Sequence, residues 1–337
     1  MNIAIDAMGG DFAPGNVVGG VRQALEKYGQ IEMLYLVGDE ATVRAELDRQ
    51  RVPSRKITLV HSTQVVEMGD SAALAVRRKK DSSIAVAVDL VKAGTCAGVV
   101  SAGHTGAAVA ATTLKLRTLA GIDRAGIASP FPNENGVCHL IDAGANVDSR
   151  PIHLFQHAVM GSVYARHVLG KQNPAIGLMS NGEEDSKGNE VSKETFKMLK
   201  DSPLNFRGNV EGRDLFQSPL DVVVCDGFVG NVLLKGCEAT AKTMFKWLRE
   251  EIHSTPFRKL GALMAKGAFR ATYKKGNYES YGGSPLLGVN GICIIAHGSS
   301  SVLAMENAIR VAVEAVAHGV NPHIEEAIAN LGQLAPA

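Results

Sequence analysis

Short runs of apolar and β-branched residues recur along the chain, and most are separated by longer segments whose apolar residues repeat at every third or fourth position. Continuous apolar runs are typical of buried strands in a parallel sheet, and the longer repeats are typical of amphipathic helices. Strands are expected at residues 3–5, 33–37, 57–61, 98–101, 137–142, 175–179, 221–225 and 291–296, and helices at 17–28, 83–93, 152–169, 194–199 and 239–252. This alternation predicts an α/β fold with a mostly parallel sheet covered by helices on both faces.

Composition narrows the class of protein further. The chain has 337 residues, 45% of them hydrophobic, and no repeat, low-complexity tract or long linker divides it. Residues 1–337 are therefore expected to form one α/β catalytic unit. A net charge of +1 does not support a nucleic-acid partner. The start MNIAIDAMGG has no leader pattern, and no run of eighteen apolar residues occurs, so a cytoplasmic protein is expected.

Five cysteines without a Cys-x-x-Cys pair predict reduced thiols rather than disulfides. Standard cofactor and nucleophile motifs are missing too: no dinucleotide fingerprint, P-loop or G-x-S-x-G elbow occurs. His153 and His157 are four residues apart on an expected helix, but they lack the glutamate of H-E-x-x-H and a third ligand. Packing or an oligomer contact is favoured for them, and neither a metal nor a cofactor is predicted.

Glycine-containing loops follow six of the expected strands. They are DAMGGDFAPG, SAGHTGAAV, DAGANVDSRP, SNGEEDSKGNE, CDGFVGN and AHGSSS. In open parallel sheets the carboxyl ends of the strands form the usual ligand-binding edge, because backbone N–H groups and helix N-termini meet there. The sequence therefore predicts a binding site built from these loops.

The SAGHTGAAV loop supplies hydroxyl groups and small residues at the start of a helix, which suits a phosphate or an oxyanion. Its candidate binding residues are Ser101, Gly103, His104, Thr105 and Gly106. A tight strand-to-helix turn requires the same glycines, so that alternative stays open.

Two other polar loops carry candidate side chains. Lys187 lies beside Gly188 in SNGEEDSKGNE, where an ammonium group can reach an anionic substrate. The mixed charge of this loop is equally typical of a solvated surface. AHGSSS brings His297 and Ser299 to a helix start, where either a ligand role or simple helix capping explains them.

The stretch CDGFVGNVLLK ends a buried strand with an acid. Asp226 either caps the following helix, with Gly227 as a turn residue, or accepts a hydrogen bond from protonated phosphate and orients Lys187. In the second interpretation Asn231 donates to substrate.

Two segments concentrate positive charge. Residues 77–80, Arg-Arg-Lys-Lys, precede an N-cap signal and are expected on a solvated face upstream of a helix. Residues 257–275 hold six Lys or Arg and no acid, with apolar residues on one side, and form a basic amphipathic helical excursion. Such a segment contacts an anionic membrane or an acidic partner, unless it packs as a lid on its own domain. The contact residues expected are Arg258, Lys259, Leu260, Met264, Lys266 and Arg270.

Taken together, these loops resemble the phosphate acyltransferases that use acyl-acyl-carrier protein, the PlsX family. The similar motifs, in order, are IDAMGGDFAP, RRKKDSS, SAGHTGA, DAGANVD, GNEVSKETF, GNVEGRDL, DVVVCDGFVGNVLLK, YGGSPLLGVNG and AHGSS. They extend over nearly the whole chain, to Val316. His104 departs from the asparagine of the family pattern, which puts a direct side-chain role at that position in question.

The resemblance implies reversible transfer of a long acyl group from acyl-acyl-carrier protein to inorganic phosphate, giving acyl phosphate for phospholipid synthesis. It also implies an isocitrate/isopropylmalate dehydrogenase-like fold and a homodimer. No cofactor is expected, and the basic segment at residues 257–275 is expected to bring the enzyme to an anionic membrane, where product can pass to a downstream glycerol-3-phosphate acyltransferase. The predicted catalytic residues are Lys187, Asp226, Asn231 and His297, and the predicted phosphate or substrate contacts are Ser101, Gly103, His104, Thr105, Gly106, Gly227 and Ser299.

Phosphate attack on a thioester needs orientation and oxyanion stabilisation more than a strong base, so direct attack is expected. Two other functions remain open. A phosphate acetyl- or butyryltransferase would use acyl-CoA instead of the carrier protein. A lipid-surface scaffold would not cleave thioesters.

Overall fold

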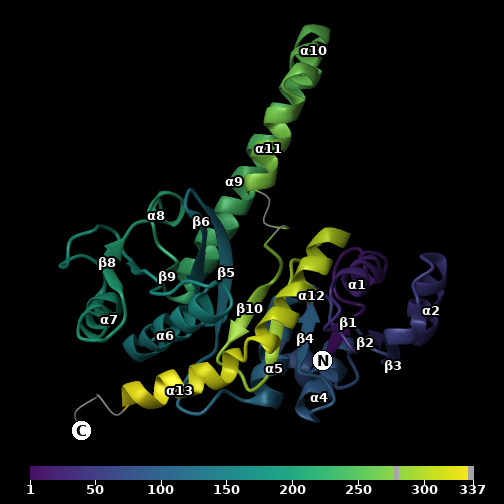
Figure 1. Cartoon of the computed structure of the whole chain (residues 1–337), viewed down its shortest axis with the longest axis horizontal. Helices are drawn as coiled ribbons and strands as arrows, with labels where there is room; N and C mark the ends of the chain where they lie inside the picture. Colours follow the sequence, from purple (N-terminus) through teal and green to yellow (C-terminus); the bar gives the residue numbers. More distant parts are fainter. Residues whose placement is uncertain (277–278, 280, 333–337) are drawn as a thin grey trace.

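An eleven-stranded sheet runs through the molecule, with helices on both of its faces (Figure 1). The computed structural model describes residues 1–276, 279 and 281–332; the side chain of Lys274, in the basic segment, lies outside this description. The strands are β1 (Asn2–Asp6), β2 (Met33–Gly38), β3 (Ile57–His61), β4 (Gly98–Ser101), β5 (Gly126–Asn133), β6 (Gly136–Ile141), β7 (Ile176–Met179), β8 (Phe206–Val210), β9 (Val222–Val224), β10 (Ser284–Leu287) and β11 (Ile292–Ile295).

The helices of the two halves are α1 (Gly15–Lys27), α2 (Glu40–Arg49), α3 (Ala72–Arg78), α4 (Ser83–Lys92), α5 (Thr105–Leu116), α6 (Pro151–His167), α7 (Glu190–Lys200), α8 (Asp214–Gln217), α12 (Val302–Ala317) and α13 (Val320–Gly332). Three further helices form a projecting arm: α9 (Gly227–His253), α10 (Pro256–Met264) and α11 (Lys266–Gly276).

Two parallel blocks make up the sheet. Strands β3, β2, β1, β4 and β11 are parallel neighbours, and so are β6, β9, β7 and β8. Between the blocks, β10 is antiparallel to both β11 and β5, and β5 is antiparallel to β6. The predicted α/β fold with a mostly parallel sheet is confirmed. All eight expected strands are present, whereas β5, β8 and β10 were not expected.

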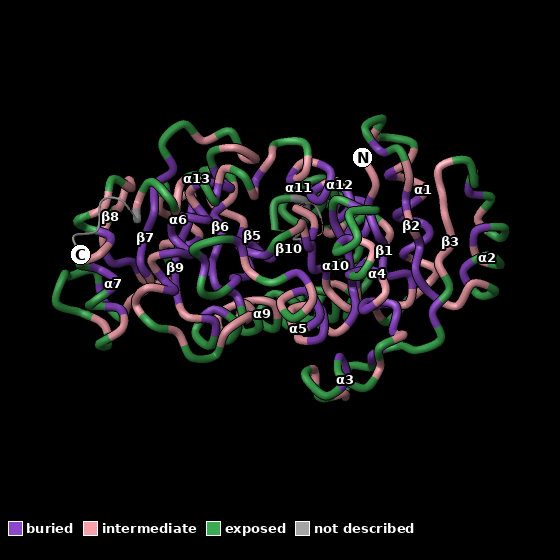
Figure 2. Tube along the Cα trace, turned by 90° about the horizontal axis from the view of Figure 1, so that it is seen from below, coloured by how far each residue is buried: buried purple, intermediate pink, exposed green. Residues whose placement is uncertain are grey.

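Alternating residues along the strands bury both faces of the sheet. Ile3 and Ile5 of β1 pack with α1, α2 and α12, whereas Ala4 between them packs with α3, α4 and α5. The second block is covered in the same way, by α6, α7 and α13 on one face and by α8 with the base of α9 on the other. The inner strands accordingly form the buried centre in Figure 2, whereas the outer strands β3 and β8 are only partly buried.

The arm extends far from the body of the molecule (Figure 1). At 1.5 Å per residue, the 27 residues of α9 span about 40 Å. Only Gly227 and Gly230 of α9 are buried, and no residue of α10 is. Phe245 of α9 packs edge to face on Tyr273 of α11, so the helices support each other. The alternative of a lid packed on its own domain is therefore wrong for residues 257–275.

The shorter basic run also differs from expectation. Arg77 and Arg78 form the last turn of α3 instead of lying outside a helix. Positive charge at a helix C-terminus interacts favourably with the helix dipole. Lys79 follows and forms an ion pair with Asp70 at 2.7 Å. In the described part of the chain no helix combines the length and the hydropathy needed to cross a membrane.

Candidate active site

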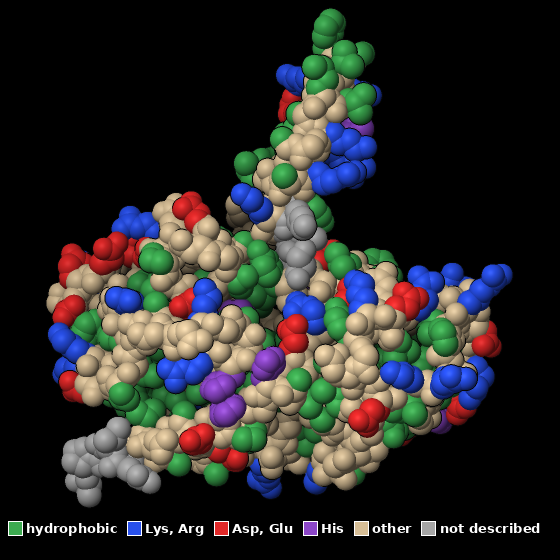
Figure 3. Space-filling view, in the orientation of Figure 1, with side chains coloured by type: hydrophobic (Ala, Val, Ile, Leu, Met, Phe, Trp, Pro, Cys, Tyr) green, Lys and Arg blue, Asp and Glu red, His purple; other side chains and the backbone are tan. Residues whose placement is uncertain are grey.

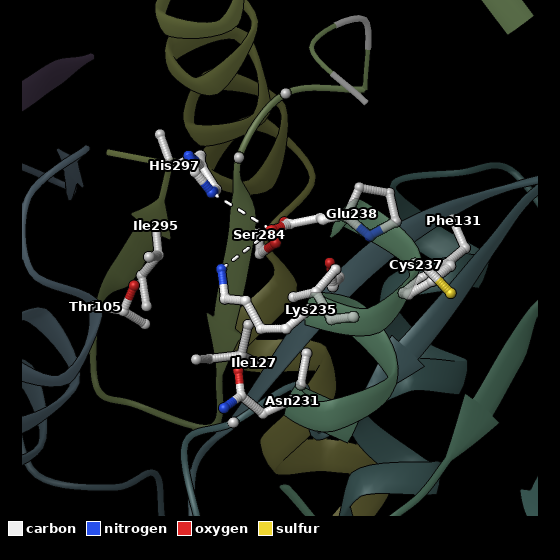
Figure 4. Close-up of a pocket in the computed structure, with 18 of the residues that line it drawn as sticks. Thr105, Ile127, Phe131, Asn231, Lys235, Cys237, Glu238, Ser284, Ile295 and His297 are labelled. Carbon is white, nitrogen blue, oxygen red and sulfur yellow. Dashed lines mark hydrogen bonds and ion pairs between the residues drawn. The ribbon is translucent and has the colours of Figure 1, made fainter. Parts of the chain in front are cut away.

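A cavity of about 430 Å³ lies where the two blocks of the sheet meet (Figure 4). Four of the six glycine-containing loops contribute to its lining, namely those that follow β4, β6, β9 and β11. Residues of β5 and the start of β10 complete the wall. Loops from both parallel blocks therefore meet at a single cavity.

Helix α9 lines the cavity with one polar face. Asn231, Lys235 and Glu238 are spaced by four and then three residues, so they project from the same side of the helix. Asn231 packs directly on the DAGAN loop: a Cβ at Gly144 would lie 3.2 Å from its Cβ, and the φ of Gly144 is +128°. Glycine is thus required for this close approach. Lys235 and Glu238 were not among the expected site residues.

A row of charged and polar groups crosses the cavity. The Lys235 Nζ lies 3.2 Å from Oε2 of Glu238, and the same oxygen lies 3.5 Å from Nε2 of His297. The backbone N–H of Ser299 donates to Nδ1 of His297 at 3.1 Å. Burial raises the pKa of Glu238, but the contacts with His297 and Lys235 outweigh it and lower the pKa to about 2. Glu238 is therefore ionised near neutral pH.

The start of α5 reaches the cavity through Thr105 and Gly106. His104 caps this helix, because its Nδ1 accepts the N–H of Ala107 at 3.2 Å. The loop thus keeps its shape with histidine at that position. Ser101 and Gly103 do not line the cavity.

Ser101 and Gly103 instead form a support behind the loop. The hydroxyl of Ser101 donates to Oδ2 of buried Asp6 at 2.7 Å and accepts the N–H of Gly103 at 3.1 Å. Beside them is a separate space of only about 10 Å³. Similarly, Ser301 caps α12 through the N–H of Ala304, while Ser300 reaches the main cavity.

Asp226 and Gly227 lie at the start of α9, just outside the cavity lining. One carboxylate oxygen of Asp226 accepts the N–H of Val229 at 3.0 Å, so the capping interpretation describes its geometry. A Cβ at Gly227 would lie 2.2 Å from the carbonyl oxygen of Asn146. Gly227 therefore allows the loops after β6 and β9 to touch.

Lys187 is exposed in the loop between β7 and α7 and does not line the cavity. Among the described residues it takes part in no ion pair within 4 Å. Strand β7 is the parallel neighbour of β9, with Leu178 paired to Val224. The loop with Lys187 and the start of α9 with Asp226 consequently follow adjacent strands at one edge of the sheet.

A buried carboxylate organises the loop after β6. Asp142 accepts five hydrogen bonds: from the backbone N–H groups of Ile127, Gly144 and Ala145 at 2.8–3.1 Å, and from the backbone and side-chain N–H groups of Asn146 at 2.8 Å. This loop places Gly144 against Asn231. Asp142 is fully buried and was not singled out from the sequence.

The two histidines on α6 have structural positions. The Nδ1 of His153 accepts the N–H of Arg150 at 3.1 Å and caps the helix, and His157 is completely buried. Throughout the described ranges, no group of three or more His, Cys, Asp or Glu is arranged to hold a metal ion.

The remaining wall of the cavity is apolar. Phe131 lies on it with its ring edge to face on Phe216, 5.9 Å between centroids. Leu234 and Ile295 are further apolar residues of the lining, and Ile295 lies beside Thr105 (Figure 4). Cys237 also lines the cavity, and burial together with Glu238 raises the pKa of its thiol. All five cysteines are free, as expected.

Comparison with known proteins identifies the family. A model described as "Fatty acid synthesis protein" matches residues 1–323. A phosphate acyltransferase from Akkermansia muciniphila is 54% identical over 99% of this chain and 97% of its own. One from Geobacter sulfurreducens is 52% identical over 97% of this chain and 94% of its own. The chain belongs to the phosphate acyltransferase family.

Solved structures of other enzymes share the fold of this family member. A phosphotransacetylase from Streptococcus pyogenes superimposes with a TM-score of 0.62 at 17% identity, covering 93% of each chain. A 4-hydroxythreonine-4-phosphate dehydrogenase from Klebsiella pneumoniae gives a TM-score of 0.50 at 13% identity, covering 93% of this chain and 99% of its own. At these identities the likeness concerns the fold alone.

Proposed function

We propose that this protein transfers a fatty acyl group from acyl-acyl-carrier protein to inorganic phosphate, forming acyl phosphate for phospholipid synthesis. The observation that carries the proposal is a cavity lined by both polar and apolar side chains. Asn231, Lys235 and Thr105 supply polar groups, and Ile127, Phe131 and Phe216 supply apolar surface. A thioester with a long chain and an anionic acceptor need that combination of surfaces.

The proposed reaction is direct attack of phosphate on the thioester carbonyl. Phosphate is already a nucleophile near neutral pH, so the enzyme has to position it and stabilise the oxyanion. The raised pKa of Cys237 keeps the only thiol among the described lining residues protonated, which argues against a cysteine acyl intermediate.

Within this proposal Asn231 donates to substrate, and Lys187 and Asp226 act from the adjacent edge of the sheet. His297 has a contact on each ring nitrogen, which suits positioning better than proton transfer. Thr105 and Gly106 contact substrate directly; Ser101, Gly103, His104, Gly227 and Ser299 shape the loops around it. Neither a metal nor a cofactor enters the reaction.

We propose that residues 1–337 work as one isocitrate/isopropylmalate dehydrogenase-like catalytic unit.

The choice of acyl donor tests the proposal against its alternatives. Thiol release measured with and without phosphate should be fast with long-chain acyl-carrier protein and at least about tenfold slower, as kcat/KM, with acetyl- or butyryl-CoA. Preferred turnover of short acyl-CoA would instead establish a phosphate acetyl- or butyryltransferase. No phosphate-dependent cleavage of either donor would favour a scaffold.

The arm is proposed to bring the enzyme reversibly from the cytoplasm to anionic membranes, where an insoluble acyl phosphate can pass to a glycerol-3-phosphate acyltransferase. Four apolar side chains near its end are 58–88% exposed: Phe257, Leu260, Leu263 and Met264. Figure 3 shows the hydrophobic end of the arm with basic side chains beside and below it. Arg258, Lys259, Lys266 and Arg270 carry that charge. We also propose a homodimer.

Replacement of both Leu260 and Met264 by glutamine should weaken binding to anionic vesicles about a hundredfold, because each insertion contributes roughly 1.5 kcal/mol. Activity with soluble carrier protein should be unchanged. The matched control replaces Leu74 and Leu114, which are exposed on the body, by glutamine. Vesicle sedimentation at low salt provides the measurement, and equal binding of the two double variants would refute insertion.

The same basic residues are also suited to dock the acidic carrier protein. Replacing Arg258, Lys259, Lys266 and Arg270 by glutamine raises the KM for carrier protein if docking dominates. An unchanged KM together with weaker vesicle binding would show that these basic residues contact the membrane and not the carrier protein.

A further inference from the structure

We propose that Lys235 is the cation that stabilises the oxyanion formed at the thioester carbonyl, and that Glu238 and His297 position it. This inference rests on the proposed acyl transfer to phosphate and names a further catalytic residue for it. It differs from the roles assigned to Lys187 and Asp226, which lie outside the cavity lining.

The location of Lys235 is the first observation. It lies one helical turn beyond Asn231 on α9, and Figure 4 shows its side chain extending into the cavity. Thr105 and Ile127 lie on one side of it, and Glu238 and His297 lie on the other. Of the described residues that line the cavity, Lys235 is the only lysine or arginine. Within the described lining, Lys235 is therefore the lysine or arginine that an anionic transition state would contact.

Positioning from two separate elements is the second observation. Glu238 lies three residues after Lys235, and a pair on one exposed helix face would be mobile and weak. Here the Glu238 side chain is only 18% exposed, and His297 contacts it from the loop between β11 and α12. The N–H of Ser299 donates to Nδ1 of His297, so neutral His297 carries its hydrogen on Nε2, toward the carboxylate. The carboxylate is thus fixed from across the cavity.

The remaining donors of Lys235 suit an oxyanion. An ammonium group has three N–H donors, and Glu238 accepts from one of them at 3.2 Å. Side-chain exposure of 57% leaves the group accessible from the cavity. A donor that is already oriented needs little reorganisation when negative charge develops.

The reaction step balances without any further reactant. A lone pair on a phosphate oxygen forms the C–O bond at the carbonyl carbon, and the C=O π pair moves onto the carbonyl oxygen beside Lys235. As that pair returns, the C–S bond breaks and its electron pair leaves on sulfur. The thiolate takes a proton from solvent, giving carrier thiol and acyl phosphate.

Replacing Lys235 by methionine removes the charge but keeps an unbranched side chain. We expect kcat to fall about a hundredfold, and Lys235→Arg, which keeps the charge, to retain at least about a tenth of wild-type kcat. The matched control is Lys242→Met, an exposed residue of the same helix outside the cavity lining, which should stay within about twofold of wild type. Thermal melts by circular dichroism check that all three variants fold.

A double-mutant cycle tests the positioning role of Glu238. Glu238→Gln alone should lower kcat about tenfold with the KM for carrier protein unchanged. In the Lys235→Met background the same change should have no further effect, because Glu238 acts through Lys235. If the two changes lower kcat additively, Glu238 acts independently of Lys235, and the proposal that it positions Lys235 is refuted.

The outcomes separate this inference from the proposed function. A wild-type protein without phosphate-dependent transfer refutes the proposed function and this inference with it. If the wild-type protein is active and the kcat of Lys235→Met lies within about threefold of the wild-type kcat, only the inference about Lys235 is refuted. Equal losses in Lys235→Met and Lys235→Arg also refute it, because the charge would then be unimportant.

Discussion

Lys187→Ala and Asp226→Asn are each expected to lower turnover about a thousandfold without loss of folding, because charge stabilisation and anion positioning supply most of the barrier reduction here. Lys187 is exposed, so alanine removes an ammonium group without opening a core cavity. Asparagine caps helices as well as aspartate does, so Asp226→Asn preserves the bond to the N–H of Val229 and removes mainly the charge.

Matched variants keep the interpretation specific. Asp39 caps α2 through the N–H of Thr42 at 2.9 Å, far in sequence from the cavity loops, so Asp39→Asn makes the same chemical change outside the site. Lys197→Ala does so for an exposed lysine of α7. Phosphate-dependent thiol release should be normal in both controls. Wild-type rates in Lys187→Ala and Asp226→Asn would remove these residues from the mechanism.

The second large effect is on stability. Asp142→Ala is expected to lower the free energy of unfolding by about 4 kcal/mol, because five N–H donors lose their acceptor at a buried position. Activity should fall as well, since Gly144 of this loop supports Asn231.

Urea unfolding followed by circular dichroism measures this difference. Asp148 is the control, since it lies in the same loop and is exposed; Asp148→Ala should change the free energy of unfolding by less than about 0.5 kcal/mol. Equal stabilities of Asp142→Ala and Asp148→Ala would contradict the organising role of Asp142.

The sequence predicted the parts of the fold that depend on local pattern. Buried strands such as β1 and β9 are continuous apolar runs, and all eight expected strands form. Strand β5 contains Pro130 and Pro132, and β10 contains Pro285, so they read as turns. Their pairing depends on strands distant in the chain, which local pattern does not report.

The start of α9 was not predicted from the sequence for a different reason. Gly227 and Gly230 disguise a helix that begins directly after Asp226, twelve residues before the expected start. Both glycines are needed for contact with another loop: a Cβ at Gly230 would lie 1.9 Å from the carbonyl oxygen of Asp142. Tertiary packing here overrides helix propensity.

Some residues of the candidate site could be predicted from the sequence, and others could not. Loop motifs were enough to predict Asn231, Thr105, Gly106 and His297, which the structure brings to one cavity. Lys235 and Glu238 had a signal in the segment NVLLKGCE, where their spacing from Asn231 gives one helix face. The contact between Glu238 and His297 required the fold, because the strand before that histidine, β11, belongs to the other block of the sheet.

Acyl transfer to phosphate is tested most directly by following both products of one reaction. The wild-type protein is incubated with long-chain acyl-carrier protein and radiolabelled inorganic phosphate, and carrier thiol is counted against label in a hydroxylamine-sensitive acyl phosphate. The proposed reaction gives the two products in equal amounts, with no thiol released when phosphate is omitted. Thiol release without incorporation of label would contradict it, because water rather than phosphate would then be the acceptor.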